Sequence, residues 1–151
     1  MKFANRIRVE FEQPSHGWLP TKVVMNDFEL EMAASNVPVN PIYLLYTAIM
    51  DVVNGSEATV WWHLEPAGYY FKFTRPEPQL YRLVISFATD HQQAPTFIYG
   101  IKGSAADIIL PFCRAIKKLA SFKHDEHDWP KLEKKQLVRL TDLISALKNV
   151  A

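Results

Sequence analysis

The chain has little of several features that commonly reveal a function. It contains one cysteine, Cys113, so no intramolecular disulfide can form, and we expect a reducing compartment, the cytoplasm. Its five glycines are scattered, so neither a phosphate-binding loop nor a dinucleotide fingerprint can be assembled, and no cofactor is expected. No apolar run approaches the length of a membrane span, and no segment near the start reads as a signal peptide.

Net charge is nearly absent as well. Seventeen basic side chains face 16 acidic ones, which leaves a formal charge of +1. Such a chain has no global field to attract nucleic acid or an anionic membrane, so we expect neither as a partner. The composition, 48% hydrophobic and 22% charged, is that of an ordinary globular protein, and the length of 151 residues predicts a single domain over residues 1–151.

Alternating side chains near the start of the chain predict strands. Residues 7–11 alternate between apolar and charged, and residues 21–25 and 28–32 form a predicted hairpin around an Asn-Asp turn. The outward positions of these strands are acidic: Glu10, Glu12, Glu29 and Glu31. We interpret this face as solvated, because exposed charge discourages edge-to-edge aggregation, and an acidic interaction surface is the alternative.

The segment 57–88 is the most informative part of the chain, because it predicts three aromatic strands, the first two joined by a Pro-Ala-Gly turn. Successive strand residues point to opposite faces, so aromatic side chains fall on both. The predicted core face holds Ala58, Val60, Trp62, Leu64, Tyr69, Phe71, Phe73, Tyr81, Leu83, Ile85 and Phe87. The second face holds the candidate binding residues Trp61, His63, Tyr70, Lys72 and Arg82. The opposite register remains open for the first strand.

Helical spacing appears in three places. An Asn-Pro pair starts a helix over residues 41–53, a second runs over about 105–122 with a kink or restart at Pro111, and a third follows Pro130. Residues 96–99 have the composition of a short edge strand. The order of three strands, a helix, three strands and two helices predicts an α+β fold, with an antiparallel or mixed twisted sheet of about six strands and helices packed on it.

Two histidine groups are candidate sites. His124 and His127 are three residues apart among acids, so one helical turn could place two imidazoles around a metal ion, although a solvated loop explains the same pattern. His63 and Glu65 share a strand face and could perform acid–base chemistry, but no nucleophile or cofactor motif accompanies them. Cys113 has apolar neighbours and is interpreted as a core residue. The chain therefore reads as a non-enzyme.

Three segments resemble small uncharacterised bacterial proteins. They are Gly17-Trp18-Leu19-Pro20, Asp27-Phe28-Glu29-Leu30 and Trp62-His63-Leu64-Glu65-Pro66-Ala67-Gly68-Tyr69. The resemblance covers about the first ninety residues and implies no activity, since none is established for those proteins. The size and class of the chain are also similar to immunity proteins of bacterial toxin systems, which is a likeness of fold alone and carries over no site residues.

Two functions follow from these patterns. The first is a non-enzymatic interaction protein that binds a protein partner, or a second copy of itself, through the aromatic face or the acidic hairpin. The alternative is a small-ligand- or metal-dependent protein that uses His63 and Glu65, or His124 and His127. An open, flat aromatic patch would favour the first, whereas a deep pocket around His63 and Glu65 would favour the second.

Overall fold

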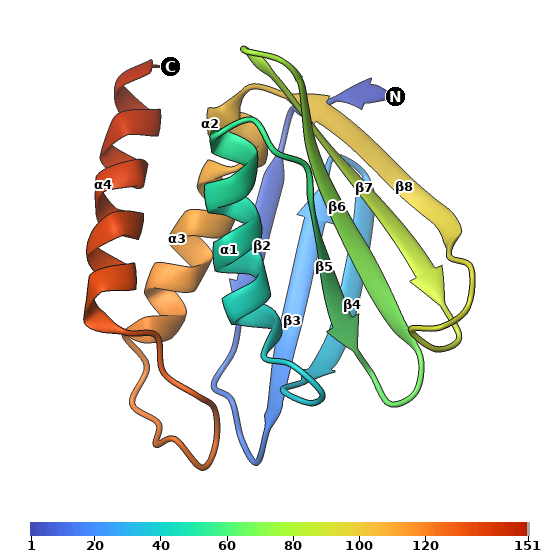
Figure 1. Ribbon diagram of the computed structural model, residues 1–151, viewed down its shortest axis with the longest axis vertical. Helices are drawn as coiled ribbons and strands as arrows, with labels where there is room; N and C mark the ends of the chain where they lie inside the picture. The colour runs from blue at the N-terminus through green and yellow to red at the C-terminus, as the bar shows by residue number, and fades with distance from the viewer. Residues whose placement is uncertain (151) are drawn as a thin grey trace.

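A computed structural model, which describes residues 1–150, shows one bent sheet with helices on one side (Figure 1). The strands are β1 (Lys2–Phe3), β2 (Ile7–Phe11), β3 (Trp18–Met25), β4 (Phe28–Ser35), β5 (Ala58–His63), β6 (Gly68–Glu77), β7 (Leu80–Ala88) and β8 (Thr96–Gly103). The helices are α1 (Pro41–Val53), α2 (Ala105–Ile108), α3 (Leu110–Ala120) and α4 (Lys134–Val150). The α+β class and the mixed sheet are as predicted.

The strand count and order differ from the prediction. The sheet has eight strands in the order β1-β8-β7-β6-β5-β4-β3-β2, not about six. Two strands account for the difference. A strand of two residues, β1, has no alternation to detect, and β8 lies between β7 and β1 over eight residues where a short edge strand was expected. Glycine lowers the intrinsic preference of a segment for the strand conformation, but the hydrogen bonds and side-chain contacts that β8 makes with β7 stabilise it as a strand.

The N-terminal segment reaches both edges of the sheet and bends it. Here β1 pairs in parallel with β8, while β2 pairs antiparallel with β3 at the opposite edge. Adjacent strands β4 and β5 share only one residue pair, Ser35 with His63. Across the bend, the ring of Phe28 on β4 stacks on that of Tyr99 on β8, with centroids 4.5 Å apart. In Figure 1, β4 passes behind β5 and β6, and β2 and β3 appear beside and behind α1.

The core fills the space between the bent sheet and the helices. Val60 and Trp62 of β5 and Phe71 and Phe73 of β6 are fully buried, and Phe112 of α3 packs edge-on against Phe73. The predicted core face of the aromatic strands is thus confirmed at these positions, and so is the preferred register of the first strand. The opposite face of β5–β8 is turned away from the helices (Figure 1).

The helix boundaries follow from local chemistry. At the start of α1, the Asn40 side chain accepts a hydrogen bond from the backbone N–H of Ile42 at 3.0 Å, directly before Pro41. The second predicted helix restarts near Pro111, as expected, giving a short α2 and then α3. Within residues 1–150, none of the helices combines the length and the apolar character that a membrane crossing requires.

Candidate functional site

The face of β5–β8 that points away from the helices gathers all five candidate binding residues. We call it the outer aromatic face and define it by three cross-strand rows. The rows, read from the strand pairing, are Trp61–Tyr70–Ser86–Phe97, Thr59–Lys72–Val84–Gly100 and Thr74–Arg82–Lys102–Phe3, with His63 beyond Trp61 on β5. Paired residues on neighbouring strands lie on the same side of a sheet, so these side chains form one continuous surface.

Trp61 is the centre of an ordered cluster on this face. Its ring lies 4.7 Å from that of Tyr70 and 5.7 Å from that of His63, measured between centroids. Its Nε1–H donates to Nδ1 of His63 at 3.0 Å, and since an indole nitrogen can only donate, Nδ1 of His63 must be the acceptor. The Tyr70 hydroxyl donates to the backbone oxygen of His91 at 2.9 Å. These contacts hold the indole in one orientation while part of it stays exposed.

Gly68 makes room for the Trp61 indole. A Cβ atom at this position would lie 2.5 Å from Cη2 of Trp61 and would also overlap the backbone oxygen of Trp62. Real Cβ atoms do not approach other atoms so closely, and a well-packed structure relieves such an overlap only by moving its neighbours. The glycine of the Pro-Ala-Gly turn is therefore required by the close approach of an indole.

Two exposed aromatic residues of this face, Phe97 and Phe3, were not predicted from the sequence. Phe97 and Phe3 are 63% and 65% exposed, and Lys102 holds its ammonium 4.6 Å above the Phe3 ring centroid. The strand composition around Phe97 was visible in the sequence, but its place in a row with Trp61 depends on pairing with β7. Nothing in the sequence connects His91, a loop residue, with Tyr70.

The outer aromatic face is basic. Its three rows contain three cationic side chains, Lys72, Arg82 and Lys102, and no acidic one. Glu57, just before β5, approaches Lys72 at 3.8 Å, and both side chains are at least half exposed. An ion pair this exposed is screened by water and contributes little, so the positive character of the face persists.

The structure does not assemble His63 and Glu65 into an acid–base pair. His63 accepts its hydrogen bond from Trp61, whereas Glu65 lies in the β5–β6 turn, where the Ser35 hydroxyl donates to it at 3.5 Å. Neither side chain lines any of the five pockets described for residues 1–150. The geometry therefore gives no support to the catalytic alternative at His63 and Glu65.

His124 and His127 lie in the loop before α4 and have different surroundings. The imidazole nitrogens of His124 are shielded from solvent, whereas the ring of His127 is 5.9 Å from that of His16. The Asp125 carboxylate accepts hydrogen bonds from the backbone of His127 and Asp128, so it is engaged in holding the loop. Over residues 1–150, no group of three or more His, Cys, Asp or Glu side chains is placed to hold a metal ion.

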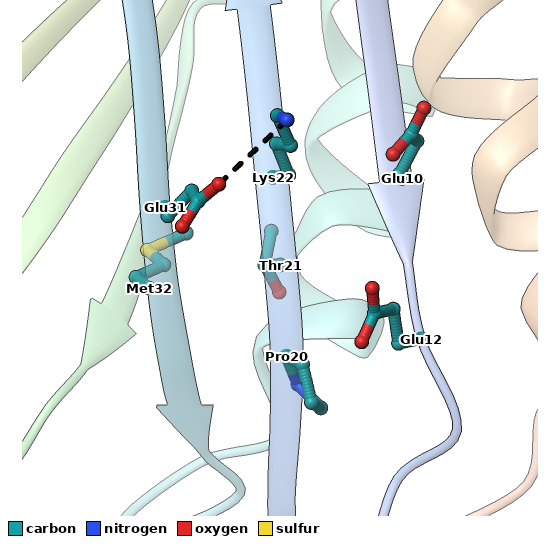
Figure 2. Close-up of a pocket in the computed structure, with 7 residues that line it drawn as sticks. All are labelled: Glu10, Glu12, Pro20, Thr21, Lys22, Glu31 and Met32. Carbon is teal, nitrogen blue, oxygen red and sulfur yellow. Dashed lines mark ion pairs between the residues drawn. The ribbon is translucent and has the colours of Figure 1, made fainter.

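The outer face of β2–β4 carries the predicted acidic residues and two cations, Arg8, which lies 2.9 Å from Glu10, and Lys22. Figure 2 shows Glu10, Glu12 and Glu31 around Lys22, in a depression of about 330 Å³. The Lys22 ammonium lies 2.8 Å from Glu29 and 3.6 Å from Glu31. Its hydrogen bond with Glu29 raises the pKa of Lys22 and lowers the pKa of the Glu29 carboxyl. This face is therefore less acidic than we expected from the sequence, because Arg8 and Lys22 share it.

Cys113 is a core residue of α3. It has no exposed surface, and burial raises the pKa of its thiol to about 12. At neutral pH a thiol with such a pKa is protonated, and the thiolate is the nucleophilic form. The structural interpretation of Cys113 is confirmed.

Comparison with known proteins adds no further constraint. The sequence matches no protein-family model and no curated protein, and no solved structure matches the chain. The resemblance of its three short segments to small bacterial proteins stays a prediction. Function has to be argued from the side chains themselves.

Proposed function

We propose that the protein is a non-enzymatic interaction protein that binds an acidic surface of a protein partner through the outer aromatic face. The observation that supports this most directly is the position of Trp61. It lies on the face turned away from the helices, and it is held there by Tyr70, His63 and the space at Gly68. An aromatic side chain that is fixed but incompletely covered has the character of a binding anchor.

Preorganisation strengthens the case for Trp61 as an anchor. Immobilising a flexible side chain on binding costs about 0.5–1.5 kcal/mol, and a side chain that is already held avoids much of that cost. The Trp61 indole has a hydrogen-bonded nitrogen and two ring neighbours before any partner arrives. Trp, Tyr and Arg are the residues that dominate binding energy at protein interfaces, and all three types occur on this face.

The charge of the face indicates the chemistry of the partner. Lys72, Arg82 and Lys102 occupy outward positions without an acid in their rows. A partner surface rich in Asp and Glu would complement them and would speed the encounter. Single-stranded nucleic acid also combines negative charge with rings that stack on aromatics, but the whole chain carries a net charge of only +1. We therefore favour a protein partner, and the experiment below also detects binding of nucleic acid.

The size of the face sets the expected strength of binding. Strands lie about 4.8 Å apart and rise about 3.3 Å per residue, so the three rows across β5–β8 and β1 cover roughly 300–400 Å² of flat area. A standard interface buries about 800 Å² on each partner. The outer aromatic face alone therefore suits a transient complex, with a Kd of about 1 μM or weaker.

Co-purification from an extract of the source organism tests this proposal. We expect one partner protein to co-purify with the wild type, and the amount recovered to fall at least tenfold with Trp61→Ala and with Tyr70→Ala. Circular dichroism checks that both variants are folded. The matched control is Tyr43→Ala, because Tyr43 is 49% exposed on α1, far from the outer aromatic face in the fold. Unchanged retention by the Trp61 variant would contradict the proposal, as would nuclease-sensitive retention or recovery of the protein only as an oligomer of itself.

A further inference from the structure

A second surface feature lies on the helical side of the molecule. A pocket of about 180 Å³ is enclosed by α1, α3, the first turn of α4 and the loop over residues 121–133. We call it the loop pocket. Its apolar wall consists of Ile42, Ile116, Leu119, Ala120, Trp129, Pro130, Leu132 and Leu137, and His124 and Lys131 complete the lining.

Three buried nitrogens belong to residues that line the loop pocket and have no hydrogen-bond partner within residues 1–150. They are Nε1 of Trp129 and both ring nitrogens of His124. Trp129 is 1% exposed, so bulk water does not satisfy its N–H in this arrangement. Proteins seldom leave such groups unpaired, because the hydration lost on burial is then not replaced. Two side chains that share one pocket and both lack partners indicate that something else completes their hydrogen bonds.

We propose that the loop pocket binds a small monocarboxylate with an apolar body. Trp129 offers one N–H donor and the His124 ring carries at least one more, so a carboxylate, with two acceptor oxygens, can accept from both side chains. Lys131 contributes a cation to the lining and forms no ion pair with any described residue. The apolar wall suits a hydrocarbon body, and a cavity of about 150 Å³ with such walls accommodates benzene.

The nitrogens are shielded from solvent, so a ligand would reach them through a small shift of the loop. The loop is attached to the sheet by few bonds. Asp128 accepts from the backbone N–H groups of Gly17 and His16 at 2.8 and 3.1 Å, and the Gln13 side chain donates to the Lys123 oxygen at 2.8 Å. Segments held by a few exposed hydrogen bonds open at low free energy, so the binding step does not require unfolding of the core.

NMR titration with benzoate tests the proposal. Benzoate has about nine non-hydrogen atoms, for which a Kd of about 1 mM is a reasonable expectation. We expect a saturable shift of the Trp129 indole N–H resonance, identified by its loss in Trp129→Phe. Benzamide, which has the same body without the charge, should bind at least severalfold more weakly, and acetate, which lacks the body, should give no saturable shift.

Two variants separate a specific site from general hydrophobic binding. Ala120→Leu adds bulk to the pocket wall at an exposed position and should weaken benzoate binding at least tenfold, whereas Ala146→Leu, on an exposed part of α4, should leave it unchanged. Trp129→Phe keeps an aromatic wall and removes only the donor, so its Kd, followed at other pocket resonances, should rise about tenfold. Absence of a saturable benzoate shift, equal binding of benzamide, or equal effects of the two alanine variants would overturn the proposal.

Discussion

Trp61 and Trp62 are adjacent in the chain but should differ sharply in their contribution to stability. Trp62 is fully buried, with its ring 5.4 Å from that of Phe71 and 6.1 Å from that of Phe11. A buried tryptophan removes about 150–250 Å² from water, which corresponds to about 4–6 kcal/mol at 25 cal/mol per Å². Truncation also leaves a cavity beneath the helices. We therefore expect Trp62→Ala to lower the free energy of unfolding by about 3–5 kcal/mol.

Trp61→Ala should lower the free energy of unfolding by only about 1–3 kcal/mol. The variant loses the aromatic contact with Tyr70, of about 0.5–1.5 kcal/mol, and the hydrogen bond to His63, of about 0.5–1.5 kcal/mol. Because the outer aromatic face is open to solvent, water fills the vacated space and no cavity penalty is added. The midpoints of the two ranges thus differ by about 2 kcal/mol.

Urea denaturation followed by far-ultraviolet circular dichroism measures this difference without relying on tryptophan fluorescence. At the scale of a 150-residue domain, 1 kcal/mol shifts the Tm by about 2–4 °C, so Trp62→Ala should melt about 10 °C lower than the wild type. If Trp62→Ala does not fold, Trp62→Phe serves instead, and the loss of the unpaired Trp62 N–H offsets part of its cost. An equal or larger effect of Trp61→Ala would refute the assignment of the two faces.

Three further predictions concern single residues. Gly68→Ala should lower the free energy of unfolding by about 1–3 kcal/mol in urea denaturation, because its Cβ overlaps Trp61, and an unchanged value would contradict the close approach. Arg75→Ala should lower the free energy of unfolding by about 1–2 kcal/mol in the same assay. Arg75 donates to the backbone oxygens of Val53 and Pro78, and these bonds join α1 to the β6–β7 turn. The control, Arg82→Ala at an exposed position, should change the free energy of unfolding by less than about 0.5 kcal/mol. Cys113 should resist thiol reagents in the native state. Burial raises the pKa of its thiol in the folded protein to about 12, from an ordinary value of 9.0, so only the unfolded chain loses this proton between pH 9 and 12. The free energy of unfolding of the wild type should therefore fall over this range relative to that of Cys113→Ala, by at most about 1.4 kcal/mol per pH unit. Equal pH profiles would refute the burial of the thiol.

The aromatic strands could be predicted from the sequence because their pattern is local. Within each of the three strands, side chains of the expected core face alternate with those of the second face, and this alternation favoured Trp62 over Trp61 for the core, which the burial of Trp62 confirms. Long-range pairing could not be predicted in the same way. The contact between Phe28 and Tyr99, which accompanies the bend of the sheet, joins residues 71 positions apart, and neither residue has a local signal for it.

The candidate sites also differ in whether they depend on a local pattern or on long-range contacts. Trp61, His63, Tyr70, Lys72 and Arg82 were expected on one face because they alternate with core residues, and the pairing confirms that placement. The loop pocket depends instead on three helices and a loop that meet only in the folded chain. Within it, the sequence drew attention to His124 as a possible metal ligand, whereas its partner in the pocket, Trp129, had no detectable pattern of its own.

Site-specific photo-crosslinking in cells of the source organism tests the central claim, that the outer aromatic face binds a protein partner, most directly. A benzophenone amino acid replaces Lys72 on that face in one variant, and Tyr43 on α1 in a control variant. Both side chains are exposed, so the two probes sample the surroundings equally well. We expect one discrete protein adduct from position 72 and no such adduct from position 43. Adducts from position 43 alone, or no protein adduct from position 72, would contradict binding through the outer aromatic face.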